Sequence, residues 1–390
     1  MERVEDKVKN ILAYSIDGKI IEFEASYTSS FADKQAENDH NIYYTEFEEY
    51  GNVSLLHGGH PVRAYQFSDV FASIRGLCTT TVLFQETSLM GVNPDYSGNK
   101  FENNTKSDFA VFLKKIKYPS EHKTPAVFCI NLWDNNYQHF FIETLPRIWL
   151  AAKEFPNLPL IVQDREFIRE ITACIFPDTM FIYLKEDDAV FLKTSYFISP
   201  ISKNYGEITK LQISAYQDIR CRFGKLKRHD VYCLAERQKY KQILYLSRKN
   251  ADSNSGKYRY MINEEDFLEK LNVSQPLIVD YYEDKSLSYK ISSVNSCGIY
   301  ITPIGANLMN FIFSQHEINI FVIAHPVVNN VRWFTKFFKS ICSTIHIMPI
   351  TQTWFDEEKY NKEQRNFPYF IKIDESVRYI VDYLSAQKSA

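Results

Sequence analysis

Residues 298–310 read Gly-Ile-Tyr-Ile-Thr-Pro-Ile-Gly-Ala-Asn-Leu-Met-Asn, which places an apolar run directly before a turn and a second apolar segment. The run 298–302 is typical of a buried strand, and Gly305 marks a tight turn before a helix expected over 306–314. Free backbone N–H groups at the start of such a helix favour an anion. The alternative is an ordinary strand-to-helix turn, of which every parallel α/β sheet has several.

The same alternation of strand and helix continues on both sides of this stretch. Asn263 is expected as the N-cap of one of the helices. Strands separated by helices at this spacing predict a parallel, doubly wound sheet, in which ligands bind at the carboxyl ends of the strands. The strands are expected at 243–246, 277–279, 298–302, 319–323 and 345–348, and the helices at 264–271, 286–296, 306–314 and 331–341.

A similar pattern begins near residue 126, so the predicted fold class is α/β, with two doubly wound, Rossmann-like domains facing a cleft. The polar, basic stretch 224–241 sets the boundary between domains at 1–225 and 226–365. An amphipathic helix in 366–390 is expected to pack back on the N-terminal domain. The first half should contain strands at 126–130, 158–162, 181–184 and 189–198 and helices at 137–153, 165–176 and 211–223, with a kink or break at Pro146.

Composition narrows the functional classes. The 390 residues are 45% hydrophobic and carry a net charge of −3, which indicates a globular protein without the basic surface of a nucleic-acid binder. Twelve glycines and the absence of any G-x-G exclude the glycine-rich nucleotide loops. Seven cysteines without C-x-x-C, behind a charged N-terminus, predict reduced thiols in the cytoplasm. A basic cluster over 220–229 is a solvated surface or, alternatively, a peripheral contact with the inner face of a membrane.

A first candidate site lies in residues 136–147, which read Asn-Tyr-Gln-His-Phe-Phe-Ile-Glu-Thr-Leu-Pro-Arg and follow a predicted strand. His139 and Glu143 are four residues apart, so they share one face of a helix. A carboxylate can hold a histidine in one tautomer while the ring accepts a proton. The alternative is a surface pair that adds a few tenths of a kcal/mol to helix stability. Two ligands are too few for a metal site.

A second candidate site begins where the strand 243–246 ends. Ser247 and Arg248 follow the strand directly, and Arg259 and the pair 263–264 come after them. Arginine bonds phosphate oxygens in pairs, which suits a diphosphate at a strand's carboxyl end. The alternative is a solvated loop. The chain contains no D-x-D, so the usual metal–diphosphate motif is absent.

Taken in order, these blocks resemble glycosyltransferase family 61, whose members show N-Y-x-H-W-x-x-E-x-L-P-R, then S-R-R with R-x-x-x-N-E, then H-G-A-x-L-x-N. Phe140 replaces the family tryptophan, Lys249 the second arginine and Ile304 the histidine. The resemblance covers roughly residues 125–325. The matching positions are Asn136, Tyr137, His139, Glu143, Leu145, Pro146, Arg147, Ser247, Arg248, Arg259, Asn263, Glu264, Gly305, Ala306, Leu308 and Asn310.

The resemblance implies a GT-B architecture, inverting chemistry and a nucleotide-sugar donor, with no metal and no cofactor. It implies that His139 or Glu143 is the catalytic base or orients it, with Asp134 as a third candidate. The donor would contact Ser247, Arg248, Arg259, Asn263, Glu264, Gly305, Ala306 and Asn307, and the acceptor side would include Asn136, Tyr137 and Arg147.

The expected function is therefore an inverting glycosyltransferase that moves a sugar from a UDP-linked donor to a hydroxyl of a glycan or lipid-linked glycan, in bacterial surface or capsular polysaccharide synthesis. Two alternatives stay open because a fold does not fix its chemistry. One is a non-catalytic nucleotide-sugar or carbohydrate-binding protein. The other is a different transferase or a phosphorylase on the same two-domain scaffold.

Overall fold

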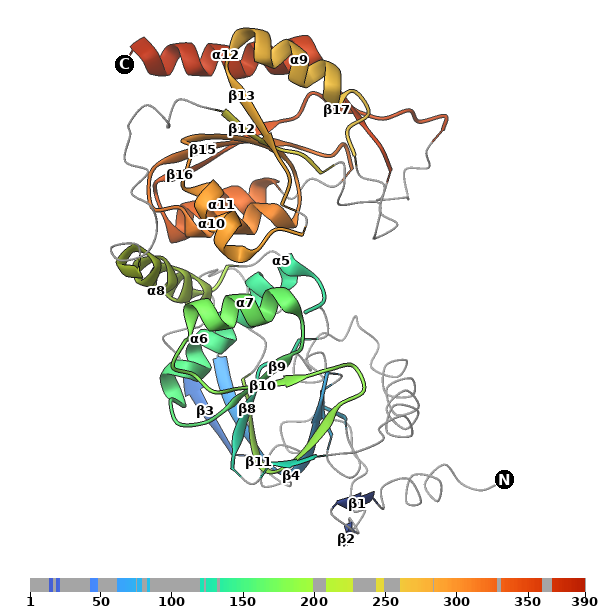
Figure 1. Ribbon diagram of the computed structural model, residues 1–390, viewed down its shortest axis with the longest axis vertical. Coiled ribbons are helices and arrows are strands. Elements are labelled where there is room, and N and C mark those ends of the chain that lie inside the picture. Colours follow the sequence, from blue (N-terminus) through green and yellow to red (C-terminus); the bar gives the residue numbers. More distant parts are fainter. Residues whose placement is uncertain are drawn as a thin grey trace. The chain divides into compact units, whose positions relative to one another are not determined.

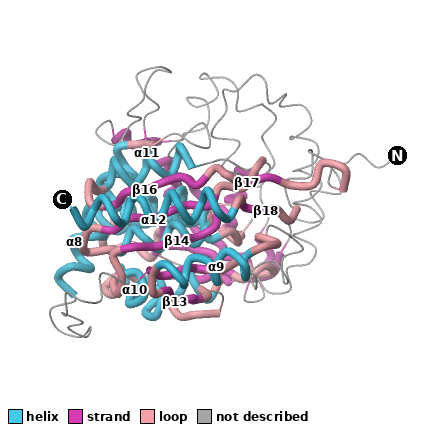
Figure 2. Tube along the Cα trace, turned by 90° about the horizontal axis from the view of Figure 1, so that it is seen from above, coloured by secondary structure: helices cyan, strands magenta, loops and turns pink. Residues whose placement is uncertain are grey.

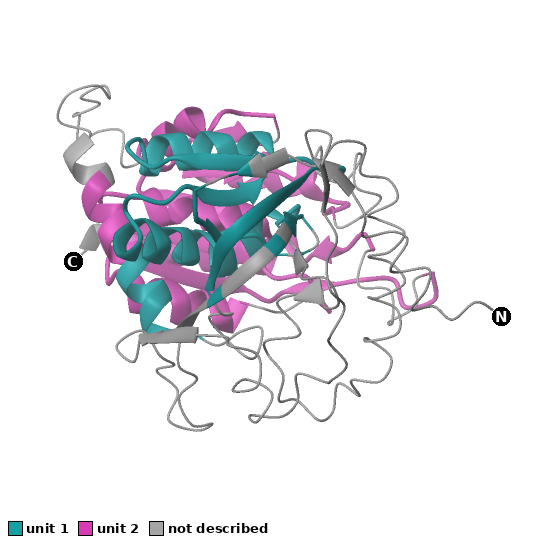
Figure 3. Cartoon of the chain, turned by 90° about the horizontal axis from the view of Figure 1, so that it is seen from below, with its two compact units in different colours: residues 1–215 teal, residues 216–390 magenta. Residues whose placement is uncertain are grey.

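The computed structural model divides the chain into two compact units, residues 1–215 and 216–390, which Figure 3 shows in different colours. The division falls inside helix α8 (Lys210–Leu226). The domain boundary expected after residue 225 lies near the end of the same helix and stays a prediction. The structure describes residues 14–16, 19–21, 43–47, 62–74, 76–78, 83–84, 120–122, 124–131, 134–198, 208–226, 243–248, 260–282, 284–327, 331–359 and 367–389.

Unit 1 contains a mixed sheet rather than the fully parallel sheet that the sequence predicted. Strands β8, β9 and β10 pair in parallel, and β11 is parallel to β7 and β8, whereas β4 is antiparallel to β11, β5 and β3. The order is β10-β9-β8-β11-β4-β5-β6, with β3 also on β4 and β7 also on β11. The strands are β3 (Tyr43–Phe47), β4 (Val62–Ser73), β5 (Gly76–Cys78), β6 (Leu83–Phe84), β7 (Ser120–His122), β8 (Ala126–Phe128), β9 (Leu160–Gln163), β10 (Phe181–Leu184) and β11 (Ala189–Ile198), and a separate hairpin joins β1 (Tyr14–Ile16) and β2 (Lys19–Ile21).

The antiparallel half went unpredicted because its key pairing joins segments far apart in the sequence. Strand β4 lies along the whole of β11, from the pair Ser73 and Ala189 to the pair Ala64 and Ile198. Val70 and Ala72 of β4 are fully buried in one hydrophobic cluster with side chains of β8 and β11. Period-two burial shows that a strand exists, but it does not give the direction of a distant partner.

The helix predicted over 137–153 is present, but it does not break at Pro146. It runs through α5 (Tyr137–His139), a π-helical turn η2 (Phe140–Thr144) and α6 (Leu145–Glu154). Within it, the N–H of Leu145 donates to the carbonyl of Phe140, five residues back, as π geometry requires. Pro146 stands in the first turn of α6, a position that proline tolerates. Helix α7 (Glu166–Ile175) lies within one residue of its expected bounds at each end.

Unit 2 contains the fully parallel sheet that the sequence predicted, in the order β13-β12-β14-β15-β16. Figure 1 shows α9 and α12 on one face of this sheet and α10 and α11 on the other. The elements are β12 (Ile243–Leu246), α9 (Glu264–Ser274), β13 (Leu277–Asp280), α10 (Leu287–Val294), β14 (Ile299–Pro303), the 3₁₀ helix η4 (Ala306–Phe313), β15 (Ile318–Ile323), α11 (Val331–Ile341), β16 (Ile345–Ile350), α12 (Ile373–Ser389) and a small antiparallel pair, β17 (Thr353–Trp354) with β18 (Phe370–Ile371).

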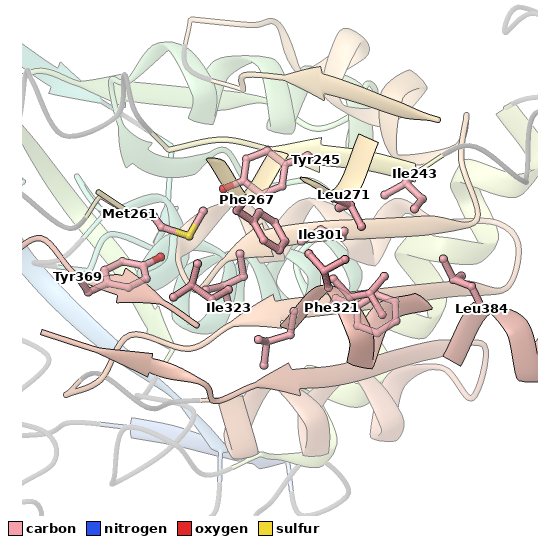
Figure 4. Close-up of a cluster of buried hydrophobic side chains, with 14 residues drawn as sticks. Ile243, Tyr245, Met261, Phe267, Leu271, Ile301, Phe321, Ile323, Tyr369 and Leu384 are labelled. Atoms are coloured by element: carbon pink, nitrogen blue, oxygen red, sulfur yellow. The ribbon is translucent and has the colours of Figure 1, made fainter. Parts of the chain in front are cut away.

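The C-terminal helix packs on the sheet of unit 2, and its expected contact with the N-terminal domain stays a prediction. Val377, Ile380 and Leu384 of α12 lie in the core cluster formed by the strands and α9 (Figure 4). The rings of Tyr379 and Tyr383 meet Phe321 of β15 edge-on. Figure 2 shows α12 beside α9 above the strands. The apolar face of α12 is therefore buried against the sheet of unit 2.

The basic cluster after residue 219 is only partly described. The guanidinium of Arg220 is half-buried and donates to the carbonyl of Ile312, and burial lowers its pKa from the ordinary value. Arg222 forms an ion pair with Asp218 one turn earlier in α8. The side chains of the remaining basic residues, 225–229, lie outside the described residues. Where the structure describes the chain, no helix is both long and apolar enough to cross a membrane.

Candidate functional site

The sheet of unit 2 has one topological switch point, between β12 and β14. From β12 the chain continues to β13, which lies on one side of β12 in the sheet. It then crosses to β14 and β15, which lie on the other side of β12. In open parallel sheets, ligands bind outside the carboxyl ends of the strands at such a point. Ser247 and Arg248 follow the carboxyl end of β12, and Ile304 and Gly305 follow the carboxyl end of β14.

Arg248 and Gly305 form the centre of this site, because the guanidinium lies directly on the glycine. Nη1 of Arg248 donates to the carbonyl oxygen of Ile304 at 2.6 Å. A Cβ at Gly305 would lie 2.1 Å from Nη1 and 2.8 Å from Cζ of Arg248. The φ of Gly305 is 171°, which is extended backbone open to any residue. The glycine is therefore needed for the close approach of Arg248 and not for a special turn conformation.

The helix predicted over 306–314 is present as a 3₁₀ helix, η4 (Ala306–Phe313). It begins with Ala306 and Asn307, and the N–H of Leu308 donates to the carbonyl of Gly305 at 3.1 Å. Its side chains are buried from Leu308 to Phe313, which ties it to the sheet. The expected binding of an anion by the backbone at residues 305–307 stays a prediction.

The other donor-side candidates have partners within the fold. The hydroxyl of Tyr245 donates to the buried carboxylate of Glu264 at 2.7 Å. Asn263 occupies the expected N-cap position of α9, but its side-chain amide instead donates to and accepts from the backbone of Ile371 in β18. The backbone N–H of Ser247 donates to the carbonyl of Asp280. These contacts fix the walls of the site, and Arg259 lies outside the described residues.

Unit 1 carries the second group of candidate residues, at the carboxyl end of β8. The loop after β8 is held by Asp134, whose carboxylate accepts from the backbone N–H of Asn131 at 2.8 Å and from the hydroxyl of Thr144. Asp134 is 0% exposed, so its carboxylate does not meet solvent in this structure. Asp134 therefore has a structural role, because its carboxylate joins the loop to the π-helical turn.

Asn136 fixes where the helix begins. Its side-chain oxygen accepts from the backbone N–H of Gln138 at 3.0 Å and of His139 at 3.4 Å, which is the geometry of an N-cap. The cap places His139 in the first turn, just beyond the carboxyl end of the strand. Asn136, predicted on the acceptor side, therefore also positions the candidate base.

His139 and Glu143 come together as the sequence predicted. Nδ1 of His139 lies 3.3 Å from Oε1 of Glu143, and the two side chains stay 23% and 18% exposed. The other carboxylate oxygen of Glu143 accepts from the side-chain amide of Asn131. A proton on Nδ1, donated to Glu143, leaves Nε2 as an acceptor that is able to take a proton. Asn131 was missed as a site residue, although it is the first polar residue after the buried strand.

Tyr137 and Arg147 flank this pair and are both packed into the unit. The ring of Tyr137 contacts Phe141 at 4.7 Å and Phe167 at 5.3 Å between centroids. Arg147 is 0% exposed, and its charge lies close enough to Cys129 to oppose the effect of burial, which raises the pKa of that thiol to about 12. Their expected role on the acceptor side stays a prediction.

Comparison with known families agrees with these two groups of residues. A family model described as Glycosyltransferase 61 matches residues 137–321, a stretch that contains His139, Glu143, Arg248 and Gly305. Comparison with curated proteins gives no match. Residues 137–321, a little under half of the chain, are therefore similar to glycosyltransferase family 61.

Proposed function

We propose that the protein is an inverting glycosyltransferase that takes its sugar from a nucleoside-diphosphate sugar. The observation that carries the proposal is the guanidinium of Arg248, which is held by Ile304 against Gly305 at the switch point of a parallel sheet. A partly exposed guanidinium at this place suits the paired oxygens of a diphosphate. The family 61 domain supports the same reaction class.

His139 acts as the base in the proposed reaction, and Glu143 orients it. Nε2 of His139 removes the proton from an acceptor hydroxyl, whose oxygen attacks the anomeric carbon from the face opposite the leaving group. The bond from that carbon to the diphosphate oxygen breaks, and its electron pair leaves on the diphosphate. Arg248 offsets the developing charge, so this route needs no metal. Asp134 is a poorer base than His139 because it is buried and already accepts two hydrogen bonds.

The proposal extends to the substrates expected from the sequence. The donor is UDP-linked, and the acceptor is a glycan or lipid-linked glycan that belongs to a bacterial surface or capsular polysaccharide. Such an enzyme works in the cytoplasm or at the inner face of the membrane. A non-catalytic nucleotide-sugar binder is the alternative, and it predicts binding without turnover.

A binding screen followed by two variants tests the proposal. The intact protein is heated with each of a panel of nucleoside diphosphates and nucleotide sugars, because a ligand that binds only the folded state raises Tm. The nucleotide sugar that binds is then used to measure sugar transfer and donor hydrolysis. His139→Ala and Glu143→Gln should abolish turnover and leave donor binding intact.

A second His–Glu pair offers a matched control. His346 lies 3.2 Å from Glu317 in an exposed pair on unit 2, so His346→Ala removes a similar contact and should keep full turnover. Binding by the wild-type protein without any turnover would favour the non-catalytic alternative. Full activity in folded His139→Ala would remove the base assignment.

A further inference from the structure

A buried carbonyl lies between the two residues of the candidate catalytic pair. In an α-helix, the N–H of residue 146 would donate to the carbonyl of Ile142, four residues earlier, but Pro146 has no N–H. The Ile142 residue is only 2% exposed, so water does not replace the missing donor readily. A buried carbonyl without a donor is costly, and native structures rarely leave one unpaired.

Gln212 supplies that donor from a different helix. Its Nε2 donates to the carbonyl oxygen of Ile142 at 2.7 Å, and its side chain is fully buried. The rest of the side chain is fixed at the start of α8, because Oε1 accepts from the backbone N–H of Thr209 at 2.9 Å. In return, the hydroxyl of Thr209 accepts from the N–H of Gln212 at 3.2 Å, which completes a capping box.

This contact reaches the site through the π-helical turn. Ile142 precedes Glu143 directly, and both lie in the turn whose geometry sets the distance from Glu143 to His139. A π-helical turn displaces backbone groups from their α-helical partners, and buried groups of this kind need other partners. We propose that Gln212 is a positioning residue, which replaces the donor that Pro146 lacks and thereby holds Glu143 against His139. Its catalytic meaning rests on the proposed function, but the contact itself is testable without substrate.

The test follows the imidazole of His139 by NMR in the intact protein labelled with ¹⁵N-histidine, with His139→Gln used to assign its signals. Gln212→Met removes the amide and keeps an unbranched side chain. It should lower Tm and shift the two ring nitrogens of His139 away from the wild-type tautomer. Thr209→Val is the matched control, since it weakens the same capping box but leaves the Gln212 amide in place. It should lower Tm without moving the His139 signals.

Pro146→Ala gives a second-site rescue, because an alanine at this position brings back the missing backbone N–H. The double variant Pro146→Ala/Gln212→Met should regain most of the lost Tm. Unchanged His139 signals in Gln212→Met overturn the proposal, and so do equal shifts in Thr209→Val. If Gln212→Met does not fold, a folded double variant supports the proposal and an unfolded one overturns it.

Transfer assays then separate this proposal from the proposed function. If the wild-type protein transfers sugar, Gln212→Met should lower kcat about 10- to 100-fold with little change in the KM for the donor, as misplaced catalytic groups do. A wild-type protein that shows no transfer contradicts the proposed function. The NMR result still decides the role of Gln212 in that case.

Discussion

Replacing Gly305 with alanine should weaken nucleotide binding far more than it weakens the fold. The new Cβ would lie 2.1 Å from Nη1 of Arg248, whereas ordinary contact begins near 3.4 Å. The guanidinium must therefore move by about 1.3 Å or more, which breaks its 2.6 Å hydrogen bond to the carbonyl of Ile304. The backbone of residue 305 is extended, so alanine adds no strain there.

The magnitude follows from what the movement breaks. A hydrogen bond that involves a charged group contributes about 1.5–3 kcal/mol, so losing one such bond to a diphosphate raises Kd about 10- to 150-fold. The cost to the free protein is smaller, about 1 kcal/mol or less, because the partly exposed guanidinium exchanges the Ile304 carbonyl for water. The clashing atoms are the far end of a flexible, partly exposed side chain.

Calorimetric titration with the tightest-binding nucleoside diphosphate measures the first effect, and urea unfolding without ligand measures the second. The control is the same substitution in an Arg248→Ala background, where the added Cβ has nothing to displace. There, Gly305→Ala should leave Kd within about twofold of Arg248→Ala alone, as expected when one residue acts only through the other. The reasoning fails if Gly305→Ala binds as tightly as wild type, or if its effect is equally large without Arg248.

Three further predictions concern buried groups. Tyr245→Phe should destabilise unit 2 by about 1–3 kcal/mol in urea, because it leaves the buried carboxylate of Glu264 without its donor. Burial raises the pKa of Tyr245, so the folded state holds that proton more tightly than the unfolded state, and the stability of the wild-type protein should fall as pH rises above about 10. Tyr245→Phe should make that fall shallower. Asp134→Ala should lower stability by about 2–4 kcal/mol, since two buried donors lose their acceptor, and chevron or equilibrium unfolding will show it. Iodoacetamide at pH 8 should label exposed Cys221 and spare Cys129, whose buried thiol has a pKa of about 12, and peptide mass spectrometry reads both sites.

The sheet of unit 2 was predictable because all the information it needs is local. Each strand there is a short apolar run followed by a helix. Because connections between parallel strands are right-handed, only a few orders of the strands in the sheet are possible. The same reasoning misjudged unit 1, where β4 pairs with β11 across more than a hundred residues. It also did not give the contacts of α12 within unit 2, since an apolar stripe shows that a helix is covered without showing which element covers it.

Within the site, spacing predicted the contact between His139 and Glu143 but not the way in which that contact is held. The π-helical turn, the cap by Asn136 and the carboxylate–amide contact with Asn131 depend on where a loop lies in space. Gly305 was predicted to mark a tight turn, but its use is steric and not conformational. The spacing of residues within one segment does not show that another segment of the chain approaches it closely.

The long pairing of β4 with β11 also sets an order of assembly. Strands β8 to β11 come from one continuous stretch of chain, whereas Ser73 of β4 precedes its partner Ala189 by 116 residues. At about 5–20 residues per second, a ribosome takes roughly 6–23 s to cover that interval. During those seconds β4 has left the ribosome without the strand that it lies along, and the closing of so large a loop has a substantial entropic cost. The slow step in making this protein is therefore expected at the seam where the sheet of unit 1 changes from parallel to antiparallel.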